Sequence, residues 1–345
     1  MRYEPISRPA DAFQRTVTAE QITAICERAF GSSARVVAAV ELGGGLYNTT
    51  FRLELPDTGP VILRVAPEPG AQSRTERELM RGEYAALPFL APLAPLLPRL
   101  LFADFSHQVI GRDYLVQSVL EGVPAPEGLA SYPRERWGGF YRQLGELTAR
   151  VHALTGDRFF GPVAGPGYAR WSDALIAGLA DTAADLEDAG VDASDLRTGI
   201  AAADAGRSVL DRVTVPRLTA GDLWVPNVML GPAAAEPRIC GMWDIDRAWW
   251  ADPASDWGVF QAACKPGTET DAFWDGYGQL EQSRDAAWRS LIYQARHWGR
   301  SGWSGTGSAA RTGSPPPATR SRRSRPSWAC SGACGVFTAV ALGGR

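Results

Sequence analysis

Residues 218–230 read LTAGDLWVPNVML, and residues 241–258 read GMWDIDRAWWADPASDWG. Together they place an Asp at 222, an Asn at 227 and a second Asp at 244, among apolar runs typical of strands. Phosphoryl transfer needs such a set, because the protein must orient a hydroxyl and neutralise phosphate charge with metal ions. We therefore predict that Asp222 is catalytic and that Asn227 and Asp244 bind magnesium. Each residue alone is better explained as a turn cap or surface group, but their order favours a site.

A glycine cluster lies upstream between two stretches with strand character, residues 36–42 and 51–55. It fits the pattern G-x-G-x-x-N and predicts a phosphate-binding loop formed by Gly43, Gly44, Gly45 and Asn48. Asn48 replaces the last Gly of that pattern, and Asn also tolerates a left-handed backbone. A dinucleotide-binding turn is disfavoured because a strand follows the glycines, and a Walker loop is excluded because the chain has no Gly-Lys-Ser/Thr. A glycine-rich hairpin without a ligand remains the alternative.

The next strand, residues 61–65, carries one basic residue, Arg64. In a kinase the corresponding strand presents a cation to the nucleotide phosphates, and a helix supplies a Glu that holds it. Lys265 is the only lysine in the chain, so an arginine has to take that place. We predict that Arg64 pairs with Glu83 of a helix over residues 73–87, with Glu76 and Glu78 as competing acids. The alternative is an exposed arginine on an edge strand.

Hydrophobic periodicity divides the chain into a β-rich part and a helical part. Thr18 and Gln21 form a capping box before one short helix, and strands dominate the rest of residues 1–117. Residues 118–300 instead show helical spacing, which predicts helices near 137–154, 171–190, 196–203 and 271–296, with strands at 228–230 and 239–243. We expect an α+β fold with a small N-terminal antiparallel β-sheet lobe and a larger, mainly helical C-terminal lobe.

These motifs resemble those of the aminoglycoside phosphotransferase and choline kinase-like family, which shares the protein-kinase-like two-lobed fold. AGDLWVPNVML from Ala220 is similar to the family pattern HGDLxxxNxL, and WDIDRAWWADPASDWG from Trp243 is similar to IDWxxxxxGDPxxDL. The resemblance covers residues from about 35 to 300. It implies transfer of the ATP γ-phosphate, with Mg²⁺, to a hydroxyl of a small molecule. It also implies that Gln117, Ser118 and Val119 form the interlobe hinge that meets adenine.

One position departs from the family pattern, because Ala220 stands where the family has His. That His orients the catalytic loop, so its absence keeps a second hypothesis open, a catalytically impaired nucleotide-binding pseudokinase. Asp252 and Asp256 match the family's DPxxD element, for which the resemblance implies a structural role. We assign no chemistry to His152, which ends the helix 137–154.

The acceptor is left open by the sequence. An aminoglycoside or another antibiotic is one candidate, and choline, homoserine or an aminated sugar are others. Residues 301–345 contribute six Arg and no acid to a net charge of −3, so residues 1–300 carry −9, which disfavours nucleic acid and is compatible with a cationic acceptor. The acidic group Asp181, Asp185, Glu187 and Asp188 is a candidate for substrate recognition, although a solvated helix face explains it equally well.

The ends of the chain give two further expectations. No apolar signal region begins the sequence and no uncharged run is long enough for a bilayer, so we expect no membrane partner and a cytoplasmic location. Residues 301–345 are rich in Ser, Gly, Pro and Arg, which predicts a disordered basic tail. Because a helical pattern is interrupted just before it, a frameshift is our hypothesis for its origin.

Overall fold

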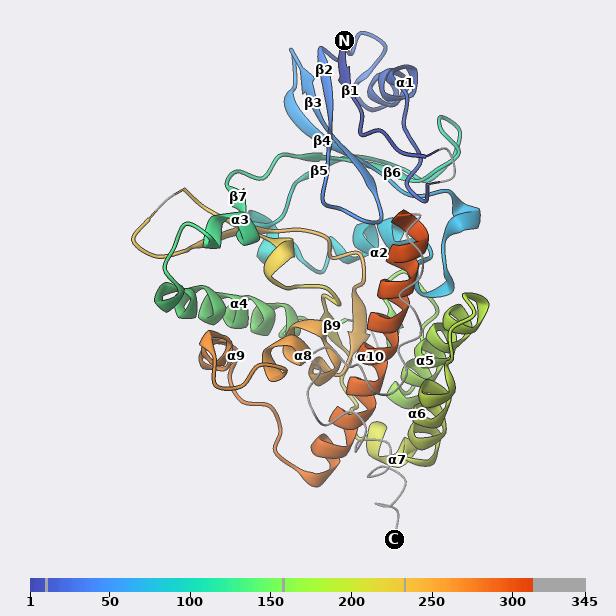
Figure 1. Ribbon diagram of the computed structural model, residues 1–345, viewed down its shortest axis with the longest axis vertical. Helices are drawn as coiled ribbons and strands as arrows, with labels where there is room; N and C mark the ends of the chain where they lie inside the picture. Colours follow the sequence, from blue (N-terminus) through green and yellow to red (C-terminus); the bar gives the residue numbers. More distant parts are fainter. Residues whose placement is uncertain (10–11, 157–158, 233, 313–345) are drawn as a thin grey trace.

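A twisted sheet lies above a group of helices in the computed structural model, which describes residues 1–9, 12–156, 159–232 and 234–312 (Figure 1). The six-stranded sheet has the order β1-β2-β3-β4-β6-β5. Its strands are β1 (Arg2–Glu4), β2 (Ala38–Leu42), β3 (Thr49–Leu55), β4 (Gly59–Val65), β5 (Leu100–Asp104) and β6 (Tyr114–Ser118). All neighbours pair antiparallel except β1 and β2, which are parallel, so the expected antiparallel sheet has one parallel edge pair.

Alternation in the sequence explains how the sheet is covered. Every second residue of β3 is buried, and these side chains pack with Ile22 and Ile25 of helix α1 (Ala19–Phe30). The predicted capping box is present, since the Thr18 hydroxyl accepts from the Gln21 amide and the Gln21 side chain accepts from the Thr18 amide. Helix α1 therefore begins where the sequence predicts and closes one face of the sheet.

The helix expected over residues 73–87 is shorter than predicted. A 3₁₀ turn, η2 (Arg74–Glu76), comes first, and helix α2 begins only at Leu79 and runs to Ala86. Glu78 between them has a left-handed backbone, φ 55°, which ends one element and starts the next. The Asp185 carboxylate also accepts the amides of residues 74 and 75 at 3.0 Å each, which favours the turn over a continuous helix.

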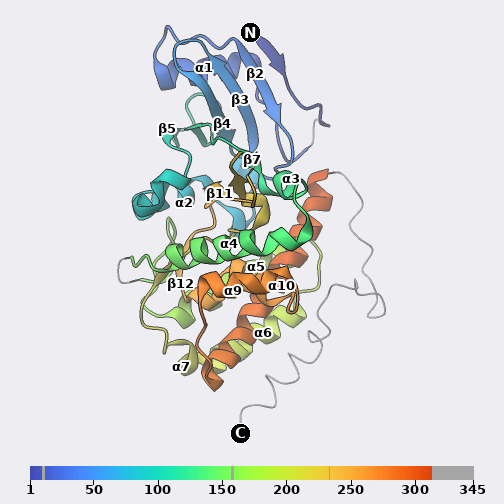
Figure 2. The same ribbon diagram turned by 90° about the vertical axis from the view of Figure 1, so that its left-hand side faces the viewer.

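The C-terminal lobe is mainly helical (Figure 2). Its helices are α3 (Ala125–Leu129), α4 (Trp137–His152), α5 (Trp171–Asp188), α6 (Ser194–Ala205), α7 (Arg207–Leu210), α8 (Trp257–Ala263), α9 (Ala272–Tyr277) and α10 (Arg284–Thr312). Two small sheets lie among them, of order β11-β10-β7 and β8-β12-β9. Their strands are β7 (Val123–Pro124), β8 (Gly161–Pro162), β9 (Arg217–Thr219), β10 (Val228–Leu230), β11 (Ile239–Met242) and β12 (Trp249–Ala251).

The structure corrects the expectation of one helix over residues 271–296. Helix α9 ends at Gly278, whose φ of 93° is a conformation that L side chains rarely adopt, and α10 starts at Arg284. Helix α10 then continues past the expected tail boundary to Thr312. The rest of the predicted disordered tail, residues 313–345, lies outside the described residues.

The predicted fold class is confirmed, since a β-rich lobe and a helical lobe form a protein-kinase-like α+β architecture. Within the described ranges, none of the helices has the length and apolar character needed to cross a membrane.

Gly145 lies where helices α4 and α9 approach each other closely. A Cβ there would lie 2.1 Å from the Phe273 carbonyl oxygen of α9, so we expect Gly145→Ala to destabilise the fold by about 2 kcal/mol or more. Gly138→Ala in the same helix is the matched control, because its Cβ would meet only Ala272 at 3.8 Å and its helix propensity gain is up to about 1 kcal/mol. Urea unfolding of both variants measures the difference, and equal stability would contradict the packing argument.

Candidate active site

The loop that carries Asp222 lies between β9 and β10, and one buried carboxylate holds it. Asp256 accepts hydrogen bonds from the amides of Ala220 (3.1 Å), Gly221 (2.9 Å) and Trp257 (2.7 Å). Gly221 has φ 75°, and a Cβ on it would lie 2.2 Å from the Arg247 carbonyl oxygen, so only glycine fits. The loop thus presents the next residue, Asp222, to the space above it.

His152 completes this support. Its Nε2 lies 2.8 Å from the second oxygen of Asp256, and its Nδ1 lies 2.9 Å from the Tyr277 hydroxyl. Burial raises the pKa of Asp256, but the His152 contact and the loop amides outweigh it and leave that pKa below the usual 3.8. A histidine on helix α4 thus supports the loop that carries Asp222, although position 220 carries Ala.

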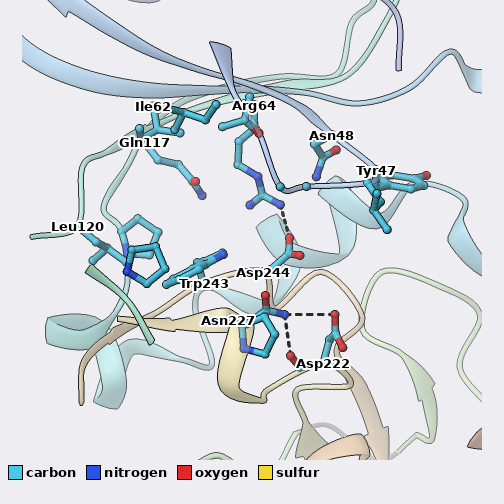
Figure 3. A pocket seen from close by; sticks show the side chains of 18 of the residues that line it. Tyr47, Asn48, Ile62, Arg64, Gln117, Leu120, Asp222, Asn227, Trp243 and Asp244 are labelled. Carbon is cyan, nitrogen blue, oxygen red and sulfur yellow. Dashed lines mark hydrogen bonds and ion pairs between the residues drawn. The ribbon is translucent and has the colours of Figure 1, made fainter. Parts of the chain in front are cut away.

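Asp222, Asn227 and Asp244 line one cavity of about 860 Å³ between the two lobes. The Asn227 amide nitrogen donates to the Asp222 backbone oxygen at 2.8 Å and to Asp222 Oδ2 at 3.2 Å (Figure 3). This leaves the amide oxygen of Asn227 for a cation. Asp244 has a left-handed backbone, φ 61°, and reaches the cavity from the end of β11. The predicted catalytic and metal-binding residues are therefore brought together.

The two lobes meet electrostatically at Arg64 of β4. Arg64 donates at 2.5 Å to Glu83 of α2. It also donates at 2.5 Å to Asp244 Oδ1, so it bridges the lobes (Figure 3). Gln117 donates to the other Glu83 oxygen at 2.9 Å. Burial opposes the charge on Arg64, but Glu83 and Asp244 outweigh it and raise the pKa of this arginine above its usual range. Glu83 is thus the acid that contacts Arg64, and it supports the cavity without lining it.

Glu76 pairs with Arg247, and Glu78 lies near Arg81, so the two competing acids have other partners.

The glycine loop between β2 and β3 forms the upper wall of the cavity with residues 43–48. Gly44 has φ 93°, whereas Asn48 has no positive φ, so the expected use of a left-handed backbone at Asn48 is wrong. Asn48 instead lines the cavity, and its side-chain oxygen is buried with no hydrogen-bond partner among the described residues. Gln14 holds the loop by donating to the carbonyls of Gly45 (3.1 Å) and Asn48 (2.8 Å).

The predicted hinge residues Gln117, Ser118 and Val119 all line the cavity. Gln117 pairs within the sheet with strands on both sides, and the Ser118 amide donates to the Arg99 carbonyl at 2.9 Å. Their amides are therefore engaged in the sheet. Val119 is the first of the three to lie beyond strand β6. Its backbone is therefore the best placed of the three to contact the adenine that the sequence analysis predicts.

Sequence reasoning missed a second group that lines the same cavity. Arg247 donates to Glu76 at 3.1 Å and places its Nε 4.0 Å from Asp222 Oδ2, while the Tyr47 hydroxyl donates to the Glu76 carbonyl. Attractive contacts with carboxylates hold Arg247 charged despite its burial and raise its pKa. Its position three residues after Asp244 was the available sequence signal.

Tryptophans near the site belong partly to the core and partly to the cavity wall. Trp250 lies in the core, whereas Trp224, Trp243 and Trp257 line the cavity. The rings of Trp224 and Trp257 pack edge to face, with centroids 6.0 Å apart.

Asp246 lines the neighbouring cavity of about 280 Å³ and is buried, and one of its oxygens has no hydrogen bond from the residues that the structure describes. Burial and the neighbouring charge of Asp244 raise its pKa well above the usual value, so negative charge is disfavoured there.

This geometry agrees with the family comparison. The model of the phosphotransferase enzyme family matches residues 38–291, which is more than half of the chain and includes the glycine loop, Asp222 and Asp244. The chain belongs to the phosphotransferase enzyme family. The predicted family resemblance is thereby confirmed.

Solved structures show the same fold in related phosphotransferases. The apo form of a thermostable mutant of aminoglycoside phosphotransferase APH(4)-Ia is 16% identical with a TM-score of 0.61, covering 95% of this chain and 99% of its own. A ternary complex of such a mutant with AMP-PNP and hygromycin B is 17% identical, with a TM-score of 0.61 and coverage of 94% and 99%. The GDP and kanamycin complex of APH(2″)-IIIa is 17% identical, with a TM-score of 0.54 and coverage of 79% and 89%. No curated protein matches this phosphotransferase.

The Asp256 support gives a testable pH dependence. Because its pKa is lowered in the folded state, Asp256 stabilises the fold fully above its unfolded value and loses this contribution as pH falls through the folded pKa. We expect Asp256→Asn to cost roughly 3 kcal/mol at neutral pH and progressively less as the pH falls below 3.8.

Urea unfolding across this pH range measures the effect. Asp275→Asn is the control, because Asp275 is an exposed partner of Arg142 and its replacement should leave the pH dependence unchanged. A constant difference between Asp256→Asn and the parent at all pH values would refute the assigned charge.

Proposed function

We propose that this phosphotransferase moves the γ-phosphate of ATP to a hydroxyl of a small molecule with the help of Mg²⁺. The observation that carries the proposal is the presence of Asp222, Asn227, Asp244 and Arg64 in one interlobe cavity. Solved structures of the same fold contain ADP, AMP-PNP or GDP together with hygromycin B or kanamycin, which supports a nucleotide and a small-molecule acceptor. Aminoglycosides and other antibiotics are candidate acceptors, and choline, homoserine and aminated sugars are the metabolite alternatives.

Each residue of the cavity has a role in this proposal. Asp222 accepts the proton of the acceptor hydroxyl and orients that oxygen towards the phosphate. Asn227 and Asp244 fit a magnesium ion, since the Asn227 amide oxygen is left free by its nitrogen contacts and Arg64 engages only Oδ1 of Asp244. When bound, such an ion would neutralise the negative charge of the phosphates.

The remaining residues hold the nucleotide. Gly43, Gly44, Gly45 and Asn48 cover the phosphates, and Arg64, held by Glu83, donates to them. Gln117, Ser118 and Val119 border the adenine. Residues 1–117 would then form the nucleotide-binding lobe and residues 118–300 the catalytic and substrate-binding lobe.

Ala220 is one of the features that motivate the pseudokinase alternative, beside Arg64 in place of a lysine and the unusual sequence of residues 301–345. The loop amides at Ala220 and Gly221 are held by Asp256, which contacts His152, so the loop has a support that does not depend on a histidine at position 220. This observation favours an active enzyme.

Substitution of the proposed base tests the function directly. Asp222→Asn should lower kcat by at least about 100-fold, because the remaining amide cannot take a proton, while the affinity for ATP stays within about threefold. Phosphoryl transfer is followed by mass spectrometry of acceptors incubated with ATP and Mg²⁺, with ADP release as a second readout. Asp211→Asn, outside the cavity, is the control. Unchanged transfer in Asp222→Asn would refute the base, and nucleotide binding without transfer to any acceptor would favour the pseudokinase.

Arg64→Lys tests the bridge between the lobes. A lysine offers a point charge without the planar fork that reaches Glu83 and Asp244 together, so we expect KM for ATP to rise about tenfold. Arg52→Lys on the neighbouring strand is a matched control, since Arg52 also lines the cavity but pairs only with Glu54 on its own strand. Equal effects of the two substitutions would argue against a specific role for Arg64.

A further inference from the structure

Two tryptophan rings line the cavity that contains Asp222, where the acceptor hydroxyl is proposed to bind. Trp224 follows the proposed base, Asp222, by two residues. Trp257 directly follows Asp256, whose carboxylate holds the loop that carries Asp222. The backbone around both rings is therefore fixed relative to Asp222. The two indoles pack edge to face and both line the cavity. Exposed indole faces favour stacking against the apolar face of another ring.

Two hydrogen-bond donors belong to this part of the wall, next to the Asp222 carboxylate. The indole Nε1 of Trp257 is buried and has no hydrogen-bond partner in the part of the chain that the structure describes. Arg247, which adds a guanidinium to the same wall, also donates. A buried donor without a partner costs about 1–3 kcal/mol, so a ligand that brings an oxygen acceptor to it is favoured.

Carboxylates that could hold ammonium groups are already engaged. Among the described residues that line the cavity, the acids are Glu76, Asp222 and Asp244. Glu76 pairs with Arg247 and Asp244 with Arg64, and Asp222 is the proposed base. A molecule with several ammonium groups needs several unpaired carboxylates when it leaves water. The cavity lining instead contains arginines, whose positive charge repels ammonium groups.

The acidic group suggested by the sequence serves another purpose. Asp185 accepts four hydrogen bonds from residues 74 and 75, Asp188 pairs with Arg74, and Glu187 pairs with Arg197. Asp181 faces a separate cavity of about 280 Å³. None of the four lines the cavity that contains Asp222, so Asp185, Glu187 and Asp188 serve to connect parts of the protein rather than to recognise an acceptor there.

From these observations we infer that the acceptor is a neutral, oxygen-rich ring compound that stacks on Trp224 and Trp257, and not a polyamine such as an aminoglycoside. The inference rests on the proposed function and narrows its acceptor class. Stacking would place the ring beside Asp222, and an ether, carbonyl or hydroxyl oxygen would accept from the Trp257 indole once that ring turns its covered nitrogen towards the cavity.

Calorimetric binding to the full chain loaded with AMP-PNP and Mg²⁺ tests this inference. The probes are a neutral panel of aryl glucosides, a hydroxylated flavone and a macrolactone aglycone, against kanamycin as the polyamine and choline as a single quaternary cation. We expect at least one neutral probe to bind about tenfold or more tightly than kanamycin and choline. Tighter binding of kanamycin or choline, or no binding by any neutral probe, would overturn the inference.

Two variants and a control examine the rings themselves. Trp224→Ala should weaken the best neutral probe about tenfold by removing the stack, and Trp257→Phe should weaken it by a similar factor by removing the donor while keeping a ring. Trp288→Phe, a tryptophan packed on Gly206 outside the cavity, should change nothing. Unaltered binding in both cavity variants would also overturn the inference.

AMP-PNP binding is measured first, because it distinguishes failure of the proposed function from failure of the proposed acceptor class. If the nucleotide does not bind, the proposed function fails. If it binds and kanamycin is phosphorylated more efficiently than every neutral probe, the function stands and the acceptor class is wrong.

Discussion

Four hydrogen bonds converge on the buried carboxylate of Asp256, and the geometry of the site depends on them. Three come from backbone amides in or near the loop that carries Asp222, and the fourth contact is the ring of His152. A buried charge is tolerated only with such partners, so the loop and the helices that carry Asp256 and His152 have to form together. This constraint places Asp222 at the floor of the cavity and makes the local glycine at 221 necessary.

A second charge, Arg64, connects this floor to the sheet above. It contacts Glu83 in the N-terminal lobe and Asp244 in the C-terminal lobe, so both contacts form only when the two lobes lie at this separation. Because arginine keeps its charge in a buried site and has several donors, it can hold two carboxylates at once, which the compact ammonium of lysine does less well. The near absence of lysine from the sequence is thus compatible with a working phosphate-binding strand.

Much of the fold and the outline of the site could be predicted because their signals are local. The motif around Asp222, the alternation of β3 and the capping box at Thr18 each depend on neighbours within a few residues, and the predicted fold class and family are confirmed. The catalytic and ligand-binding roles stay predictions, although the residues concerned lie in or directly support one cavity.

The features that escaped prediction depend on long-range partners. Glu76 and Arg247 are 171 residues apart, and His152 and Asp256 are 104 apart, so no window of sequence shows either pair. The break before α2 follows from Asp185, which lies on a helix of the other lobe. Trp257 has the apolar character of a core residue, and only its place at the start of α8 directs it to the cavity.

The hold of Asp185 on the turn before α2 also bears on how the cavity empties. The lobes are joined by the chain after β6 on one edge and by Asp185 on α5 at the other (Figure 1). Rigid separation of the lobes would therefore break several hydrogen bonds at once, whereas displacing the glycine loop breaks the contacts made by Gln14 and Tyr47. In the proposed function, local lifting of that loop is the route by which a nucleotide would leave the cavity, and Gln14 and Tyr47 would oppose it.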